Sequence, residues 1–418
     1  MVVHDPLREA FEIREKLASE KRKLAFFFGA GTSMAVGIPG IDALTEKVSE
    51  DLEEPFKAQF QNVRKKISGN ANVENVLDRI RSIRELMGDS HEEVYDGIKG
   101  ATDVKLLDSA ICQAISKIVS REPSKEIKPH LILAQWLRSL HVDRLFPVEV
   151  FTTNYDLLFE QAMEYAGVPF FDGFVGAVHP FFTPESVEAE DNKISQSAYP
   201  PRTWTRLWKI HGSINWLMLQ NAGKKRVTRL SGLEPKKGEE LMIFPSREKY
   251  IESRKLPFIT FQDRLRKFLS TGEALFIIAG YSFSDEHINE IIFQGLRSNP
   301  RLSIMALMYG DGKVEAGKTQ LVLSDKIIRY GQEHRNLIIY GPDRACIGGI
   351  VAFWGEPGRK KKDTEIWPFW DDNSKGFTLG EFCSFTSYLE VFIGFRTSHI
   401  FPLDTQPIAE SKGPSAEA

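Results

Sequence analysis

Several features that would assign this sequence of 418 residues to a class of protein are missing from it. Its 3 cysteines, Cys112, Cys346 and Cys383, are far apart and form neither a disulfide framework nor a C-x-x-C zinc pair. Its longest apolar runs, such as residues 274–279, are much shorter than the roughly 18 residues that span a bilayer. Residues 1–20 carry charges throughout and contain no apolar segment of a signal peptide. We therefore expect a soluble, cytoplasmic protein of prokaryotic style.

An excess of charge of either sign is also missing. The chain has 54 basic and 57 acidic residues, a net charge of −3, so no overall basic field attracts nucleic acid or an acidic membrane. The basic stretches 224–226 and 359–362 are short and lack interleaved aromatic residues, which favours solvated loops over direct nucleic-acid binding. The histidines show no metal-ligand spacing such as H-E-x-x-H, and we expect no metal site.

A sizeable core is within reach of this chain, because 42% of its residues are hydrophobic. Residues 24–28 form a continuous apolar run, which is typical of a strand buried on both faces. Further strand signals lie at 148–152, 207–210, 241–244, 274–279, 302–308 and 336–340. Helical patterns follow several of them, at 157–166, 285–297 and 323–334. This alternation predicts an α/β fold with a mostly parallel sheet covered by helices on both sides.

The pattern changes twice along the chain. Residues 42–145 show amphipathic helices and no convincing strand, which indicates a helical insertion at about 45–145 within a catalytic domain of residues 1–345. The polar stretches 184–205 and 220–240 indicate long loops or lids. Residues 346–406 are predicted to be a C-terminal extension, and residues 407–418 a disordered tail.

Two glycine turns follow buried strands. The first turn consists of Gly29, Ala30, Gly31, Thr32 and Ser33. Such a turn lets the backbone approach a pyrophosphate, and Thr32 or Ser33 adds a hydroxyl donor, although a turn and helix cap without a ligand is an equal alternative. The second turn consists of Gly280, Tyr281 and Ser282, before Ser284 or Asp285 as a helix cap. It suits the second half of a dinucleotide site, but many α/β turns share this pattern.

Polar side chains that suit catalysis follow two other strands. Asn154, after Thr153 at the end of strand 148–152, can both donate to and accept from a ribose or a water molecule. Asp156 can accept from an amide, or it can simply cap the helix that begins at residue 157. His211, followed by Gly212, is placed to act as a base near neutral pH, or it is a hydrogen-bonded core histidine.

Four motifs follow one another along the chain: Gly29-Ala30-Gly31-Thr32-Ser33, Thr153-Asn154-Tyr155-Asp156, His211-Gly212 and Gly280-Tyr281-Ser282. In this order, over roughly residues 20–345, they resemble the sirtuin family, and more closely the sirtuin-like domains of bacterial anti-phage defence. The chain departs from sirtuin deacylases in three ways. Thr153 replaces a glutamine, Gly40-Ile41-Asp42 stands where deacylases carry Asp-Phe-Arg, and a four-cysteine zinc module is missing.

The resemblance implies a Rossmann-like fold and NAD+ as the substrate. It implies that Asn154 orients the ribose or a water molecule, that His211 acts as a base, and that Asp156 holds the nicotinamide carboxamide. It implies that Ala30, Thr32 and Ser33 meet the pyrophosphate and that Gly280 and Ser282 lie near the adenosine half. The other residues that it implies bind the cofactor are Gly29, Gly31, Thr153 and Tyr281. Because deacylase features are missing, water is the expected nucleophile, and the implied activity is an NAD+ glycohydrolase that depletes NAD+ in infected cells.

Two alternatives remain open from the sequence: an NAD-dependent protein deacylase or ADP-ribosyltransferase, and a non-catalytic subunit that senses NAD+ or ADP-ribose. The length of the chain is similar to that of the subunit encoded beside a HerA-type ATPase. That resemblance implies a homo-oligomer that docks onto a hexameric ATPase. We expect the polar stretches 184–205 and 220–240 to gate the site, and the aromatic-rich segment 377–401 to lie in a subunit interface.

Overall fold

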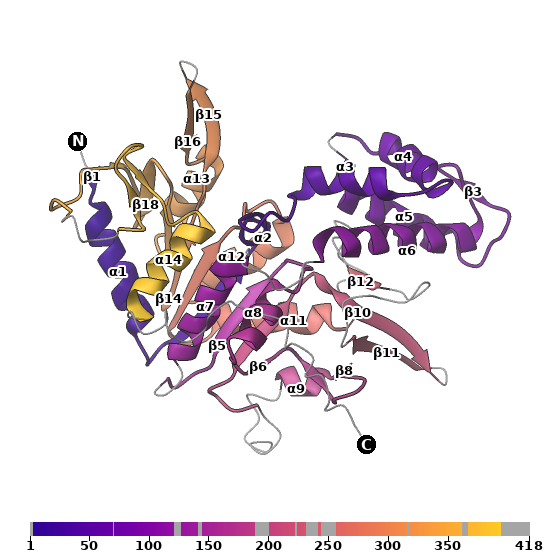
Figure 1. The fold of residues 1–418 in the computed structure, drawn as a ribbon, viewed down its shortest axis with the longest axis horizontal. Coiled ribbons are helices and arrows are strands. Elements are labelled where there is room, and N and C mark those ends of the chain that lie inside the picture. Colours follow the sequence, from indigo (N-terminus) through magenta and orange to yellow (C-terminus); the bar gives the residue numbers. More distant parts are fainter. Residues whose placement is uncertain are drawn as a thin grey trace, which may run out of the picture.

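A computed structural model of the chain describes residues 3–69, 71–120, 127–140, 144–188, 200–221, 224–230, 241–243, 256–315, 318–361 and 367–393. A ten-stranded sheet forms its centre, in the order β1-β19-β18-β17-β14-β13-β2-β5-β9-β6 (Figure 1). The strands are β1 (Val3–His4), β2 (Lys23–Phe28), β5 (Val148–Thr152), β6 (Phe170–Phe171), β9 (Thr205–Lys209), β13 (Ala274–Ala279), β14 (Leu302–Leu307), β17 (Leu337–Tyr340), β18 (Arg344–Ile347) and β19 (Ile350–Trp354). Strand β18 runs antiparallel to both neighbours, and the other described pairs are parallel. The predicted α/β fold with a mostly parallel sheet is confirmed.

The apolar runs of the central strands supply two cores, one on each face of the sheet. Successive side chains of a strand point to opposite faces, so Ala25 and Phe27 of β2 pack in one core while Leu24, Phe26 and Phe28 pack in the other. Helices α11 (Phe258–Ser270), α12 (Glu286–Ser298) and α13 (Asp325–Glu333) cover the first face. Helices α1 (Pro6–Ala18), α7 (Lys128–Ser139), α8 (Leu158–Tyr165) and α14 (Phe382–Ile393) cover the second.

The predicted helical insertion is a bundle with a core of its own. It consists of α3 (Ile41–Asp51), α4 (Phe56–Lys66), α5 (Val73–Met87) and α6 (Gly100–Val119), and it extends to one side of the sheet (Figure 1). A short hairpin of β3 (Val94–Tyr95) and β4 (Ile98–Lys99) joins α5 to α6. Val48, Phe60, Leu77, Ile80 and Ile111 are fully buried between these helices. The predicted range of about 45–145 also contains α7, but α7 packs on the main sheet and not in the bundle.

A second sheet corrects part of the loop prediction. Its order is β12-β10-β11-β8-β7, with β12 (Leu241–Ile243), β10 (Gly212–Asn221), β11 (Lys224–Arg229), β8 (Phe181–Phe182) and β7 (Phe174–Val175). The basic stretch 224–226, predicted as a loop, is therefore part of strand β11, which pairs with β10 and β8. Arg226 lies over an aromatic ring, 4.0 Å from the ring centre of Phe181. The predicted strand 241–244 also belongs here rather than to the main sheet. Of the stretch 184–205, residues 184–188 form helix α9 (Pro184–Glu188), and residues 189–199 lie outside the described part.

The C-terminal segment folds back into the same core. Strands β18 and β19 extend the main sheet, and β1, from the other end of the chain, pairs with β19. Phe385 and Leu389 of α14 are fully buried, and the ring of Phe382 lies 5.6 Å from that of Phe28. Phe377, Phe382, Phe385 and Leu389 are thus covered within one chain, whereas Val391 is 54% exposed. The predicted subunit interface and the predicted domain boundaries stay predictions. Residues 394–418, including the predicted tail 407–418, lie outside the described residues.

Two hairpins complete the described structure. Strands β15 (Asp311–Glu315) and β16 (Lys318–Val322) form an antiparallel pair that projects beyond the main sheet (Figure 1). Strands β20 (Trp370–Asp371) and β21 (Gly376–Phe377) form a second pair before α14. No helix of the described residues is long and apolar enough to cross a membrane.

Candidate functional site

The order of the strands places a switch point at the centre of the sheet. From β2 the chain proceeds to β5 and β9 on one side, and then to β13, β14 and β17 on the other. In open α/β sheets, ligands bind at such a switch point, outside the carboxyl ends of the strands. The last residues of four adjacent strands are in register with one another: Ala279, Phe28, Thr152 and Lys209. All four predicted motifs therefore begin at one level along the same edge of the sheet.

The two glycine turns pack directly against each other at this point. Gly29 N donates to Ala279 O at 3.1 Å, and Gly31 N donates to Gly280 O at 2.9 Å. A Cβ atom on Gly31 would lie 2.7 Å from the Cα of Gly280. Gly280 itself has φ +65°, and a Cβ on it would lie 2.7 Å from Thr32 N. The glycines thus permit a close approach of two backbone segments. The sequence offered only a turn that binds a ligand or a turn that caps a helix as reasons for these glycines.

Asn154 is held by the first glycine turn. It is 6% exposed, and its Nδ2 lies 3.1 Å from Gly29 O, 3.0 Å from Thr32 Oγ1 and 2.8 Å from Ser33 Oγ. No described residue makes a hydrogen bond to its Oδ1. Because its donors are used internally, the oxygen is the group that Asn154 can offer to a ligand.

The hydroxyls of the turn also point inward. Thr32 and Ser33 are buried; Thr32 Oγ1 donates to Gly29 O at 2.9 Å, and Ser33 Oγ donates to Asp156 Oδ2 at 2.6 Å. The other oxygen of Asp156 accepts from Leu158 N, the first residue of α8, at 3.1 Å, so Asp156 ties Ser33 to the start of α8. The N-cap residue of α8 is Leu157, one position after the cap that the sequence offered. Ala30 is exposed at the surface of the turn. The direct contacts of Thr32, Ser33 and Asp156 with NAD+ stay predictions.

His211 lies in the turn between β9 and β10, beside Asn154. Thr152 of β5 and Lys209 of β9 are paired in the sheet. Asn154 follows Thr152 by two residues, and His211 follows Lys209 by two residues. The turn is tied to the neighbouring loop, because Ile210 N donates to Thr152 O at 2.8 Å. His211 is 14% exposed, and its Nε2 lies 3.2 Å from Asp285 Oδ2. The structure therefore brings together Asn154, His211 and the two glycine turns, as the order of the motifs predicts.

Asp285 is a site residue that the sequence identified only as a helix cap. Its Oδ1 accepts from His287 N at 3.0 Å and from Ile288 N at 3.2 Å, which caps α12 as expected. Its Oδ2 faces His211. No spacing rule connects an aspartate to a histidine that lies on a distant strand, so no local pattern announces this pair.

Lys209 is a second residue that sequence reasoning missed. Its side chain is 2% exposed, and its Nζ donates to the backbone oxygens of Tyr155 and Asp156 and pairs with Glu160 Oε1 at 2.9 Å. Burial raises the pKa of Glu160, which the charge of Lys209 opposes. This buried cation fixes the loop that carries Asn154. The only signal for it was a lysine at the end of an otherwise apolar strand.

The helical bundle reaches the same loop. Tyr155 Oη donates to Glu74 Oε1 of α5 at 2.5 Å. Burial, together with the charge of Glu74, raises the pKa of Tyr155 well above its usual value. Leu157 and Ile214 pack in the core of the bundle. The bundle is therefore joined to both loops that carry the candidate catalytic residues.

The remaining predicted contacts divide into packing and surface positions. Tyr281 is buried against Phe27, with ring centres 4.9 Å apart, and its hydroxyl lies 2.9 Å from Asn289 Oδ1. Ser282 is exposed and lies 3.0 Å from Ser284, oxygen to oxygen, while Thr153 is partly buried. Within the described residues, no group of three or more His, Cys, Asp or Glu side chains could hold a metal ion.

Comparison with known proteins agrees with this geometry. Residues 148–330 match the family model of the SIR2-like domain, a range that contains Asn154, His211, Gly280 and Asp285. The first glycine turn precedes the matched range and packs onto it. No curated protein matches the chain. Residues 148–330 are thus similar to the SIR2-like domain, and the mostly parallel sheet of the described residues is consistent with a Rossmann-like SIR2 fold.

Proposed function

We propose that the protein is an NAD+ glycohydrolase that cleaves NAD+ to nicotinamide and ADP-ribose. The observation that supports this most directly is the position of Asn154 and His211, each two residues after the end of one of two adjacent strands, β5 and β9, beside the switch point. SIR2-like domains use NAD+ and are often NAD-dependent enzymes, so NAD+ is the substrate to consider first.

The side chains at this edge suit the binding of a ribose. The free Oδ1 of Asn154 can accept a hydrogen bond from a ribose hydroxyl or from a water molecule. Ala30 is exposed, and it is the position in the glycine turn that a pyrophosphate can approach.

Cleavage of NAD+ does not need a strong general acid. Nicotinamide leaves NAD+ as a neutral molecule, so the site must hold the ribose and deliver a nucleophile. His211 is partly exposed and can take a proton from a water molecule or from a ribose hydroxyl. The missing deacylase features noted in the sequence favour water as the nucleophile.

The proposed cellular role rests on the resemblance to the sirtuin-like domains of bacterial anti-phage defence alone. We infer a cytoplasmic homo-oligomer that docks onto a hexameric HerA-type ATPase and depletes NAD+ in phage-infected cells. A permanently active NAD+ hydrolase would harm its host, so we expect the ATPase to raise turnover. A truncation near residue 343 cannot test assembly, because it would remove β18, β19 and α14 from the core. Light scattering and co-purification on the full chain are the suitable measurements.

Turnover by the purified full chain tests the catalytic proposal. Chromatography should show nicotinamide and ADP-ribose accumulating without added peptide. His211→Ala and Asn154→Ala should each lose about 100- to 10,000-fold in rate, the usual range for a general base. His179→Ala, at an exposed histidine outside the site, is the matched control and should keep wild-type turnover.

Three outcomes would contradict the proposal. Wild-type turnover in His211→Ala would show that His211 is not the base. O-acetyl-ADP-ribose as the main product with acetyl-lysine peptides would show a deacylase. Binding of NAD+ without cleavage, in the presence and absence of the ATPase, would show a sensing subunit.

A further inference from the structure

We propose that Asp285 positions His211 for catalysis, by holding its imidazole with the proton on Nε2 and leaving Nδ1 to act as the base. This inference rests on the proposed NAD+ hydrolase for its catalytic consequence. The pairing itself is a property of the folded chain and can be tested without turnover.

The geometry assigns a separate task to each oxygen of the Asp285 carboxylate. Oδ1 accepts from two backbone amides at the start of α12, His287 N and Ile288 N. Oδ2 lies 3.2 Å from Nε2 of His211, a close approach at ion-pair distance that does not meet hydrogen-bond geometry, and the side chains of Asp285 and His211 are 10% and 14% exposed. A carboxylate that is already fixed by its cap cannot rotate freely, so Oδ2 presents a stationary acceptor to the ring.

The loop before Asp285 is held in an uncommon conformation. Phe283 is fully buried and has φ +55°, the left-handed region that a bulky residue rarely adopts. Asn289 supports it, because its Nδ2 donates to Phe283 O at 2.9 Å and its Oδ1 lies 2.9 Å from the hydroxyl of Tyr281. A residue in this region costs about 1–3 kcal/mol, and it persists where the surrounding contacts determine it. The loop is thus built to place Asp285 at one position.

The tautomer follows from the chemistry of the pair. A neutral imidazole has one N–H and one lone pair, and a carboxylate can only accept. The short distance to the carboxylate favours the proton on Nε2, the nitrogen next to Asp285, and Nδ1 then keeps its lone pair. As the oxygen of water bonds to C1′, its O–H proton passes to Nδ1, and the C1′–N electron pair leaves with nicotinamide. The carboxylate then stabilises the imidazolium that has formed.

Asp285→Asn tests this arrangement and leaves the helix cap in place. Its Oδ1 can still accept from both amides, so the amide nitrogen replaces Oδ2 and presents only donors to His211. Nε2 must then accept, and the proton moves to Nδ1. We expect nitrogen-15 NMR of labelled histidine to show the tautomer inverted, with the His211 signal assigned by its loss in His211→Ala. We expect kcat to fall by about 100-fold or more while KM changes by less than about twofold.

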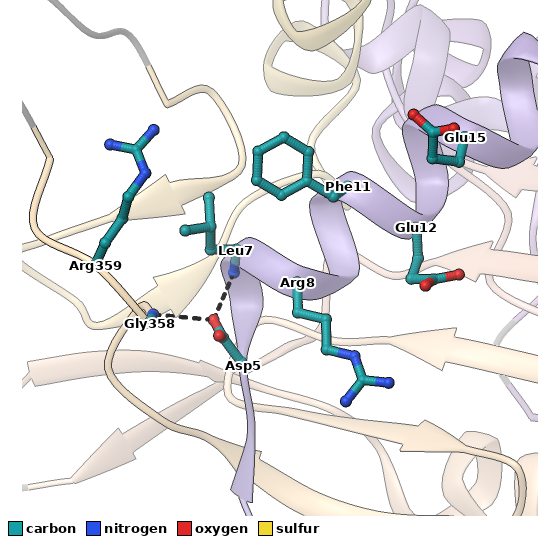
Figure 2. A pocket seen from close by; sticks show the side chains of 8 residues that line it. All are labelled: Asp5, Leu7, Arg8, Phe11, Glu12, Glu15, Gly358 and Arg359. Carbon is teal, nitrogen blue, oxygen red and sulfur yellow. Dashed lines mark hydrogen bonds between the residues drawn. The ribbon is translucent and has the colours of Figure 1, made fainter.

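Asp5→Asn is the matched control. Asp5 caps α1, which has 13 residues like α12, and its Oδ1 also accepts from two amides, Leu7 N and Gly358 N (Figure 2). Its other oxygen faces no histidine ring nitrogen among the described contacts. This variant should keep wild-type kcat, KM and His211 tautomer. Asp285→Ser, which keeps a capping oxygen but offers His211 no neighbour, should give mixed tautomers and a smaller loss of kcat.

The results separate the pairing from the hydrolase. The inference would be overturned, even if NAD+ is cleaved, by a proton on Nδ1 of His211 in the wild-type protein. It would also be overturned if the imidazole of His211 kept its wild-type tautomer in the Asp285→Asn variant. Equal kcat in Asp285→Asn and Asp5→Asn would also overturn it. If the wild-type chain does not cleave NAD+, the proposed function fails, and the tautomer inversion alone decides whether Asp285 orients His211.

Discussion

Replacing Gly280 by alanine would test whether the contact between the two glycine turns holds the site together. Gly280 has φ +65°, and its new Cβ would lie 2.7 Å from Thr32 N and 3.0 Å from the carbonyl carbon of Gly31. Both neighbours are backbone atoms that cannot rotate away. The turn that carries Thr32 and Ser33 must therefore shift, and these two side chains hold Nδ2 of Asn154.

The cost has two parts. The left-handed backbone costs an alanine about 1–2 kcal/mol, offset by about 0.4–1 kcal/mol because alanine restricts the unfolded chain more than glycine does. Overpacking adds about 1–3 kcal/mol when the neighbours must move. We expect Gly280→Ala to lower the free energy of unfolding by about 2–4 kcal/mol in total.

Gly348→Ala separates the two parts. Gly348, in the turn between β18 and β19, has φ +60°, and a Cβ there would meet nothing within 4 Å. This variant carries the backbone cost alone, so we expect a loss of about 1 kcal/mol and unchanged turnover. Urea unfolding followed by tryptophan fluorescence would measure both variants. The midpoint should move further for Gly280→Ala, with the slope m unchanged.

Turnover of NAD+ provides the second measurement. A displacement of about 1 Å at a positioning residue can cost about 100-fold in rate, so Gly280→Ala should lose turnover beyond its loss of stability. Equal unfolding midpoints in the two variants would refute the reasoning about the close contact. Full turnover in a folded Gly280→Ala would refute the link from the turn to Asn154.

Two further predictions concern buried ionisable groups. His130 of α7 is 1% exposed between Phe159 and Phe382, and burial lowers its pKa to about 3. Because the unfolded chain binds this proton below pH about 6.5, the free energy of unfolding should fall between that pH and pH 3 by up to about 1.4 kcal/mol per pH unit. Urea unfolding at several pH values should show a weaker dependence of this free energy on pH in His130→Phe than in the wild type. An equal dependence in the two proteins would contradict the prediction. Lys209→Met should lower stability by about 3–5 kcal/mol, because Glu160 keeps a buried charge without its cation, and adding Glu160→Gln should restore part of it. A double variant as unstable as Lys209→Met would show that the lost backbone contacts matter more than the charge.

Local patterns were sufficient where burial decides the structure. The apolar runs at 24–28 and 274–279 form β2 and β13, because a strand covered on both faces needs apolar side chains at every position. The helices after β5 and β13 each begin one residue after the predicted position, and Asp285 caps the second as expected. Local chemistry also located the polar residues at the strand ends.

Local patterns failed where a distant partner changes the meaning of a residue. The basic stretch 224–226 is predicted as a solvated loop, yet it lies in strand β11, where the exposed Arg226 covers the ring of Phe181. The aromatic side chains of α14, in the segment 377–401, find a partner within the chain, since Phe382 and Phe385 pack against β2, while the predicted subunit interface of this segment stays a prediction. In each case the apolar surface that accepts the side chain comes from another part of the chain.

By itself the sequence determined the α/β class and the chemical groups that stand at the ends of β2, β5, β9 and β13, because the periodicity of apolar residues and the turn residues are local properties. Only the tertiary structure decided which of these ends are neighbours. Strand order and register place Asn154 beside His211 and close the two glycine turns on each other. They also bring Asp285 to 3.2 Å from His211. Such contacts depend on how the sheet is assembled, since hydrogen bonds between strands carry no side-chain code that can be read along one strand.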